Sequence, residues 1–419
     1  MVRLLAPLLL LGLLATACEP NPNVSSGADL LIASDFPTSY PRLFAVQREQ
    51  IIQLAINERD HIGRFKLGYV PFDDFLGDAP SQAKGVQNVK QMIANARVLG
   101  MVGPWTSNMA YAEIPVANPS DLVMLSPANT SECITIPYPS CGAGKPPWKY
   151  QSHPNNYFRI AAPEPLQGRA MARYISESLG VKRVAAFNEL GATGTLFIKE
   201  FGDELARTGG KMVFGPDLPA GTTSFKSFLD SAKAAGAQAI YAVADFGDGQ
   251  CAARAQMAEI FPKEAYFMGA DGMVSWSGGT SEAAKDDQCI KDAVGNGEGM
   301  LTATSDIDLT RNKDAVSMKA VAAFRKAYPQ NTDIASYTFA IYDCARLLLD
   351  AISRAVQANG GGIPTRAQVV NAVAQAHFEG VTGTYAFDAQ GDALSPMMSL
   401  YRVENGHWVL VKAIDASAK

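Results

Sequence analysis

Short apolar segments alternate with amphipathic segments along most of the chain. Apolar runs of about four to eight residues that alternate with helical periodicity are typical of parallel strands covered by helices on both faces. We expect strands at 30–36, 64–74, 98–104, 121–127, 157–163, 183–189, 211–217, 237–245 and 265–271. We expect helices between them at 43–59, 83–96, 107–117, 166–179, 195–208, 225–235 and 250–261. Because the series restarts after a Pro-rich loop, the pattern predicts two α/β lobes.

The C-terminal part of the chain has a different pattern. Long amphipathic segments come first and strand-like segments with turn residues between them follow. The expected helices are 314–328, 338–357 and 366–376, and the expected strands are 382–388, 397–403 and 407–413. In open parallel sheets, ligands bind beyond the carboxyl ends of the strands. Residues that directly follow strands are therefore the first candidates for a binding site.

The N-terminal segment is typical of an export signal. Arg3 precedes an apolar run of eleven residues, 4–14, which is too short to span a bilayer. The sequence Ala-Thr-Ala-Cys at 15–18 resembles a bacterial lipobox. We therefore predict a signal peptide at 1–17, lipidation of Cys18 and a flexible tether at 18–29, which would anchor an exported protein to the cell membrane. The alternative is an ordinary signal peptide followed by a coincidental cysteine.

Cysteine usage is compatible with export. Cys133 and Cys141 bracket a loop rich in Pro and Gly, and a disulfide would hold that loop in place. Cys251 and Cys289 lie beside neighbouring strand-like segments and form the second predicted disulfide. Cys344 is then a buried free thiol in a helix. Metal-ligating thiols are the rival interpretation, but the chain has no C-x-x-C motif.

Composition excludes several function classes. The 419 residues carry a formal net charge of −5 and no long basic run, which argues against nucleic acid and against a polybasic membrane surface as partners. The four histidines lack metal-ligand spacing, which argues against a histidine metal centre and leaves a carboxylate site as the alternative; we predict no metal. G-x-S-x-G, H-E-x-x-H and a complete P-loop are absent, and GNGEGM (295–300) precedes a strand instead of a helix. We therefore predict a binding protein without a cofactor, not an enzyme.

Four stretches together resemble one family. They are VLGMVGPWTSNMAYAEIPVANPSDLVMLSPANT (98–130), YFRIAAPEPLQGRAMARYISE (157–177), AYFMGADG (265–272) and EGMLTAT (298–304). In order and spacing they resemble the type I periplasmic binding proteins of ABC importers, in the leucine/isoleucine/valine-binding branch. The resemblance runs from about Leu30 to Ile414.

The resemblance implies two Rossmann-like lobes, joined by a three-strand hinge, that close over a small ligand in the cleft between them. The chain is expected to cross between the lobes near Arg159, Thr304 and Thr384. Lobe 1 would then comprise 30–158 and 305–383, and lobe 2 would comprise 159–304 and 384–415.

The same resemblance assigns polar residues to the ligand. Ser107 and the N–H groups at the start of its helix would bind a carboxylate, although a helix-capping serine is the plainer interpretation. Ala128 would contribute its carbonyl. Thr130 would contribute a hydroxyl that can both donate and accept. Asp271, in the other lobe, would pair with an α-ammonium group, although an aspartate in a turn is often only a turn former.

The resemblance also predicts an aromatic wall and shows one departure. Tyr337 and Phe246 fall near positions where the family places aromatic side chains against the ligand, and Trp105 would narrow the pocket. Each could instead pack in the core. Ala192 stands where the family has a tyrosine that contacts the ligand. The family's branched aliphatic ligand therefore cannot simply be assigned to this chain. Asp245 would either suit a cationic or polar ligand or cap the following helix.

These features favour a transport protein. We predict a monomer that captures a small amino acid or a related polar compound and delivers it to the permease and ATPase subunits of an ABC importer. The alternative is a receptor subunit of the same fold that senses an amide or a carboxylate. The sequence does not identify the ligand.

Overall fold

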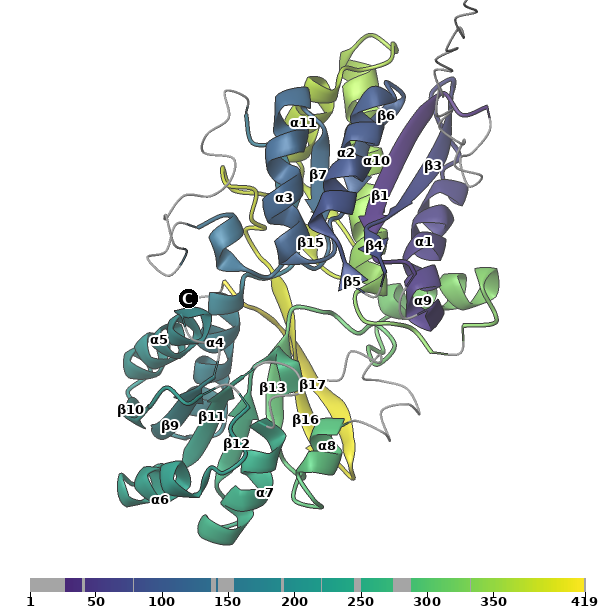
Figure 1. Ribbon diagram of the computed structural model, residues 1–419. Coiled ribbons are helices and arrows are strands. Elements are labelled where there is room, and N and C mark those ends of the chain that lie inside the picture. The colour runs from purple at the N-terminus through teal and green to yellow at the C-terminus, as the bar shows by residue number, and fades with distance from the viewer. Residues whose placement is uncertain are drawn as a thin grey trace, which may run out of the picture.

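The computed structural model describes residues 27–39, 42–77, 79–136, 141, 154–189, 192–219, 221–244, 250–273, 288–331 and 333–417. The chain forms two α/β lobes that lie one above the other in Figure 1. Each lobe is built around its own sheet, which confirms the predicted fold class. None of the helices in the described part of the chain is long and apolar enough to cross a membrane.

The first lobe contains a six-stranded sheet in the order β2-β3-β1-β6-β7-β8. All neighbouring strands are parallel except β2 and β3. The strands are β1 (Leu30–Phe36), β2 (His61–Ile62), β3 (Phe65–Asp73), β6 (Val98–Val102), β7 (Val123–Ser126) and β8 (Tyr157–Arg159). Two small hairpins, β4 (Phe75–Leu76) with β5 (Ala79–Pro80) and β14 (Phe378–Glu379) with β15 (Thr384–Tyr385), lie outside this sheet.

Helices cover both faces of this sheet. The core on one face takes its apolar side chains from α2 and α3, and the core on the other face takes them from α1, α9, α10 and α11. Their bounds are α1 (Arg42–Asn57), α2 (Gln82–Ala94), α3 (Ser107–Ala117), α9 (Ala315–Ala327), α10 (Thr338–Ala358) and α11 (Arg366–Ala374). Both sheet faces are therefore buried, which is why the strands are mostly apolar.

The second lobe contains a seven-stranded sheet in the order β10-β9-β11-β12-β13-β16-β17. Its first five strands are parallel, and β16 and β17 add an antiparallel edge. The strands are β9 (Arg183–Asn188), β10 (Lys211–Phe214), β11 (Ala239–Val243), β12 (Tyr266–Gly269), β13 (Leu301–Thr304), β16 (Met397–Glu404) and β17 (His407–Asp415). The helices are α4 (Glu164–Arg173), α5 (Ala192–Arg207), α6 (Lys226–Ala234), α7 (Gln250–Ile260) and α8 (Gln288–Asp292). Helix α4 continues as a π-helical turn, Tyr174–Ser178, within the span predicted as one helix.

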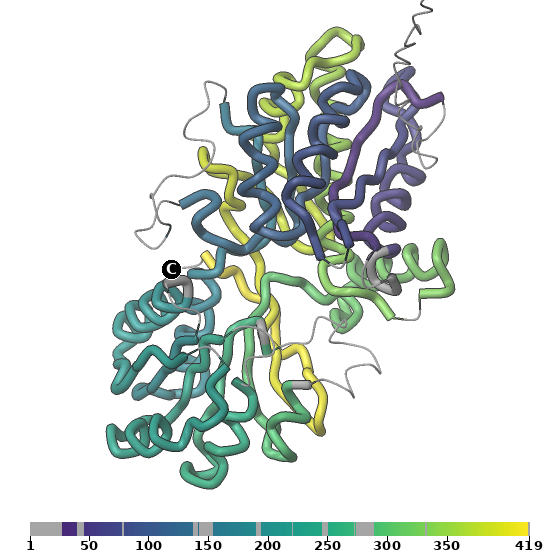
Figure 2. The backbone as a smooth tube through the Cα atoms, in the orientation of Figure 1, coloured from purple at the N-terminus to yellow at the C-terminus, as the bar shows by residue number. Residues whose placement is uncertain are grey.

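The chain passes between the lobes three times, and the passages lie close together in Figure 2. The first passage joins β8 to α4 and the second joins β13 to α9, next to the predicted positions Arg159 and Thr304. The third passage lies later than the predicted Thr384. Tyr385 and Phe387 still pack in the core of the first lobe. The chain therefore leaves that lobe after Phe387 and before β16.

The disulfides Cys133–Cys141 and Cys251–Cys289 are both present, with Cα atoms 5.4 and 5.1 Å apart. Cys344 is free and buried in α10. These three predictions from the cysteine pattern are confirmed. The predicted signal peptide and Cys18 lie outside the described residues.

Candidate ligand-binding site

Two loops of the first lobe leave the carboxyl ends of β6 and β7 side by side. Thr106, not Ser107, caps α3, because its hydroxyl accepts a hydrogen bond from the Met109 N–H. The Ser107 Oγ accepts one from the Ser131 N–H at 3.2 Å, which joins the two loops. The plainer interpretation of Ser107 as a helix cap is therefore wrong. Ala128 and Ser107 are both partly exposed at this edge.

Thr130 bridges the two lobes at the first passage. Its Oγ1 donates to Glu164 Oε1 at 3.0 Å, and the Glu164 N–H donates to the Thr130 carbonyl at 2.8 Å. Burial, together with the negative charges of Glu132 and Asp271, raises the pKa of Glu164 to about 8. Glu164 and Glu132 were not predicted as site residues, because neither directly follows a strand.

Asp271 follows β12 in the second lobe and opens a short 3₁₀ helix, Asp271–Met273. Burial is the main cause of the raised pKa of Tyr337, and the negative charge of Asp271 is the next. The negative charge of Asp271 also raises the pKa of Glu164. Since such effects weaken with distance, the charge of Asp271 lies within electrostatic range of Tyr337 and Glu164.

Trp105 and Tyr337 form an aromatic wall in the first lobe. Their rings meet edge to face with centroids 5.6 Å apart, and Phe36 meets Trp105 at 6.0 Å. The Arg48 guanidinium lies 3.9 Å from the centre of the Trp105 ring. Burial lowers the pKa of Arg48 to about 10. Nothing in the local sequence distinguishes Arg48 from a solvent-facing helix residue, so it was not predicted.

The backbone of Tyr337 is held in an unusual conformation. Its φ is +61°, in the left-handed region that side chains with a Cβ rarely adopt. The Tyr337 N–H donates to Asp306 Oδ1 at 2.8 Å, and its hydroxyl pairs with Ser305 Oγ at 2.7 Å. Both partners belong to the second passage, so the ring position is coupled to the connection between the lobes.

Arg159 holds the loop that carries Thr130. The side chain is fully buried, its Nε pairs with Asp392 Oδ1 at 2.6 Å, and its Nη1 donates to the Asn129 and Ser131 carbonyls at 3.2 and 2.6 Å. Its Nη2 donates to the Thr135 hydroxyl. The first and third passages are therefore linked to the binding loop by one guanidinium group.

A second acidic cluster lies inside the first lobe, beneath the same sheet edge. Asp35, Asp74 and Glu113 are fully buried, and five of their six carboxylate oxygens have no hydrogen-bond partner. Asn88 Nδ2 donates to the remaining oxygen, Asp35 Oδ1, at 2.8 Å. Burial raises the pKa of all three carboxyls, and for Asp74 the pKa reaches about 7.

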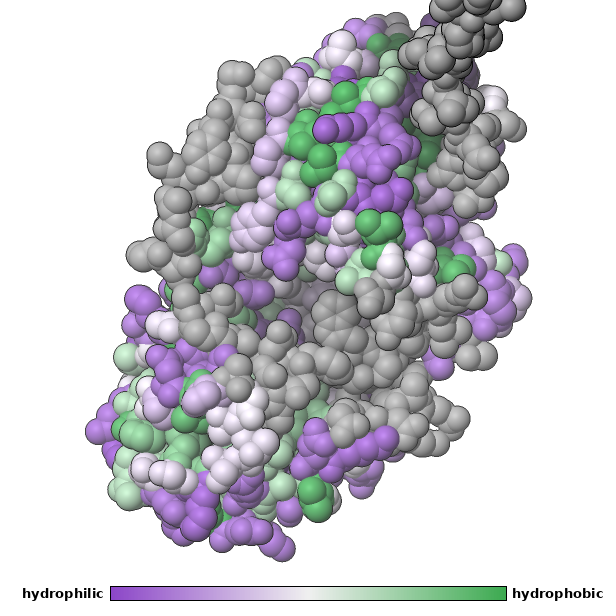
Figure 3. All heavy atoms as spheres, viewed as in Figure 1, coloured by the Kyte–Doolittle hydropathy of each residue, from purple (hydrophilic) through white to green (hydrophobic). Residues whose placement is uncertain are grey.

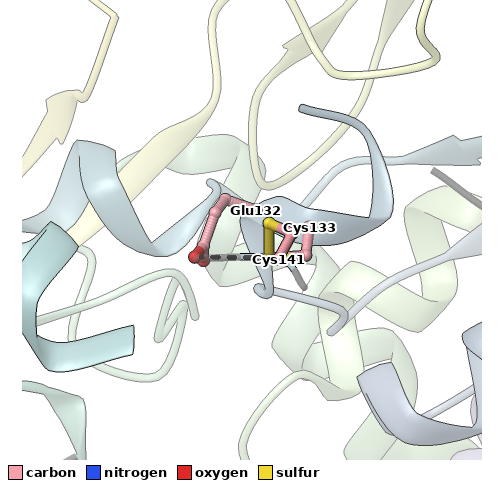
Figure 4. Close-up of side chains that lie close together, drawn as sticks. All are labelled: Glu132, Cys133 and Cys141. Atoms are coloured by element: carbon pink, nitrogen blue, oxygen red, sulfur yellow. Dashed lines mark hydrogen bonds between the residues drawn. A yellow bond between two sulfur atoms is a disulfide. The ribbon is translucent and has the colours of Figure 1, made fainter. Parts of the chain in front are cut away.

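Glu132 lies beside the disulfide between Cys133 and Cys141 (Figure 4). A carboxylate with two cysteines is a possible metal-ligand set. However, both sulfur atoms are joined to each other, so neither is a thiolate that could bind a metal. The rival interpretation of these cysteines as metal ligands does not fit this geometry.

The remaining predicted residues are not placed. Ala192 begins α5, but its side chain is outside the described part of the structure. Asp245 and Phe246 lie outside the described residues altogether. Their roles stay predictions.

On the face drawn in Figure 3 the surface is recessed between the two lobes.

Comparisons with known proteins agree with this architecture. A family described as periplasmic binding protein matches residues 55–407. The chain is 23% identical over 389 residues to the Leu/Ile/Val-binding protein homolog 3 of Brucella melitensis, with 90% of this chain and 92% of that protein covered.

Solved structures share the fold. An ABC transporter substrate-binding protein from Desulfitobacterium hafniense in complex with Leu has a TM-score of 0.69 at 22% identity, covering 91% of this chain and 99% of that one. A solute-binding protein from R. palustris in complex with 4-hydroxybenzoate has a TM-score of 0.66 at 18% identity, covering 92% and 96%. These relatives are binding proteins and not enzymes, which confirms that prediction. The chain belongs to the periplasmic binding protein family and has its two-lobed type I fold.

Proposed function

We propose that the protein captures a small amino acid or a related polar compound between its lobes and delivers it to an ABC importer. One observation carries this proposal: Ser107 and Thr130 follow strands of the first lobe, Asp271 follows a strand of the second, and the charge of Asp271 acts on Glu164, which binds Thr130. Family membership supports a location outside the cytoplasm. The lipid anchor at Cys18, the monomeric state and the permease and ATPase partners complete the proposal.

The chemistry of these residues suits an α-amino acid. The first N–H groups of α3 and the Ser107 hydroxyl would donate to a carboxylate, since a helix N-terminus is positively polarised. Asp271 would pair with the α-ammonium group. Trp105 and Tyr337 supply apolar surface beside them. A zwitterion enclosed between lobes loses its water, so each of its charges needs such a fixed partner.

Asp271→Asn is expected to weaken binding of an α-amino acid by about 2–5 kcal/mol, or roughly 30-fold to several thousand-fold. The amide keeps the size of the side chain but leaves the ammonium group without its ion pair. Ser107→Ala should cost only about 1–3 kcal/mol, because the backbone donors remain. Calorimetry with a ligand found by a thermal-shift screen of amino acids and small amides measures both effects.

The exposed Asp230 on α6 provides the matched control. Asp230→Asn removes an equal charge from the surface of the second lobe and should leave affinity unchanged. If Asp271→Asn binds as tightly as the wild type, the ligand has no ammonium group at this position, and an amide or a carboxylate replaces the amino acid in the proposal.

Ligand binding is expected to favour a closed arrangement of the lobes, because contacts from both lobes are available only when the lobes meet around the ligand. Small-angle X-ray scattering should then give a smaller radius of gyration at saturating ligand than without it. Asp271→Asn at the same ligand concentration should stay close to the unliganded value. An unchanged radius for the saturated wild type would contradict capture by closure.

A further inference from the structure

Two glutamates lie together where the first passage enters the site. Glu132, in the 3₁₀ turn Glu132–Ile134, is 1% exposed, and Glu164 is the first residue of α4. The Oε2 atom of each is buried and has no hydrogen-bond partner. Neither forms an ion pair with any residue that the structure describes. A buried, unpartnered carboxylate oxygen is costly unless a donor or a cation reaches it.

The surrounding groups do not neutralise this pair. The charges of Arg159 and Glu164 attract each other, but the Arg159 hydrogen bonds go to Asp392, the Thr135 hydroxyl and two backbone carbonyls. The Tyr111 hydroxyl pairs with Ser131 Oγ at 3.0 Å. Asp271 faces the pair from the second lobe and adds a further negative charge. The site therefore contains more negative charge than one α-ammonium group would balance.

We propose that the ligand is a basic α-amino acid whose side-chain cation, a primary ammonium or a guanidinium group, binds at Glu132 and Glu164. This inference rests on the proposed function, in which Asp271 receives the α-ammonium group. The N–H groups of either cation would supply the donors that the two Oε2 atoms lack. A neutral aliphatic side chain offers no donor to either oxygen.

Binding of such a cation releases a proton. Without ligand, Glu164 holds a proton at neutral pH, because burial beside the charges of Glu132 and Asp271 raises its pKa to about 8. When the cation arrives, the Glu164 proton leaves to solvent, and the carboxylate that remains accepts hydrogen bonds from the ligand. Beyond the pair, the charged and titratable groups around Glu164 are Asp271, Arg159 and Tyr111.

Calorimetry with L-lysine, L-arginine and L-norleucine tests the proposal, because norleucine has the lysine side chain without its amine. At pH 7 we expect lysine or arginine to bind at least about 30-fold more tightly than norleucine, the lower end of the range for a buried charge pair. Titrations in phosphate and in Tris, which differ in ionisation enthalpy, should show release of up to about one proton with the basic amino acid and none with norleucine.

Glu132→Gln should reduce the preference for the basic amino acid over norleucine by about tenfold or more and abolish proton release. Glu164→Gln should do the same, and the double variant should lose little more than either single one, because the two groups act as a pair. Glu379→Gln, on the exposed β14 strand, is the matched control and should change nothing. Circular dichroism verifies that each variant folds.

The outcomes separate this inference from the proposed function. Norleucine binding as tightly as lysine and arginine, or an unaltered preference in both glutamate variants, would overturn the cationic subsite while leaving amino-acid capture intact. If lysine, arginine and norleucine all fail to bind but another amino acid from the thermal-shift screen binds, only the cationic subsite is overturned. If no compound of that screen binds the folded protein, both proposals are overturned.

Discussion

Arg159→Met is expected to lower the free energy of unfolding by about 3–5 kcal/mol, the usual cost of removing one partner of a buried ion pair. The substitution leaves Asp392 buried beside Thr135 with no cation. It also removes the donors that hold the Asn129 and Ser131 carbonyls. Urea unfolding followed by circular dichroism measures the change. Ligand affinity should fall as well, since the same loop carries Thr130.

A second substitution distinguishes lost charge pairing from lost packing. In the double variant Arg159→Met, Asp392→Leu no charge remains buried, so much of the lost stability should return. Arg159→Lys keeps the charge but cannot supply the planar set of donors, and should be intermediate. A double variant that is no more stable than Arg159→Met would show that the unpaired charge of Asp392 is not the cause of the loss.

The protein is expected to be more stable near pH 5 than near pH 8. Burial raises the pKa of several carboxyl groups above the value of about 4 that they have when unfolded. These groups are Asp35, Asp74, Glu113, Glu164, Asp306 and Asp343, with pKa values of about 7 for Asp74 and Asp306, about 8 for Glu164 and about 6 for Asp343.

The folded state therefore holds protons that the unfolded state has released. The stabilisation is complete below the unfolded pKa and is lost as the pH rises through about 6 to 8. Below about pH 4 the trend reverses, because Arg207 and Arg173 lower the pKa of Glu204 to about 2 and that group loses its ion pairs on protonation. Scanning calorimetry at a series of pH values from about 4.5 to about 8.5 covers the pKa values of these groups in the unfolded and folded protein. The melting temperature should fall as the pH rises.

Glu113→Gln tests the origin of this pH dependence. Glutamine has the shape of protonated glutamic acid, so it fits beside Gly85, where a Cβ would lie 2.3 Å from Glu113 Oε1. It removes a group that must lose a proton at high pH. We expect a gain in the free energy of unfolding at pH 8 and little change at pH 5. Glu379→Gln should follow the wild type; equal slopes for all three proteins would contradict the assignment.

Much of the fold could be predicted because each strand is a short apolar run bounded by turn residues. The strand at 30–36 and the helix at 107–117 were predicted at the ends that the structure gives them. Ser107, Thr130 and Asp271 could be predicted as candidates, since they directly follow strands and the resemblance supported them. The π-helical turn in 174–178 could not, because it does not alter the apolar periodicity of its segment.

The polar network behind the site could not be predicted from local patterns. Arg159 and Asp392 are 233 residues apart, and neither has a neighbour in the sequence that indicates an ion pair. Glu132 and Glu164 meet only because the first passage brings α4 beside the loop after β7. Buried charges of this kind depend on tertiary contacts between segments, and sequence periodicity records only which face of one segment is buried.

The order in which the two sheets receive their strands and helices has a consequence for synthesis. Helix α10 packs on α1, β6 and β7, so the part of the first sheet that it covers stays exposed until 338–358 have emerged from the ribosome. By then β9 to β13 are already available, while β16 and β17 are still missing from the other sheet. Neither half can finish folding on its own as the chain grows. Nascent chains of this protein therefore expose apolar surface until late in translation, and chaperones would act on them chiefly during that interval.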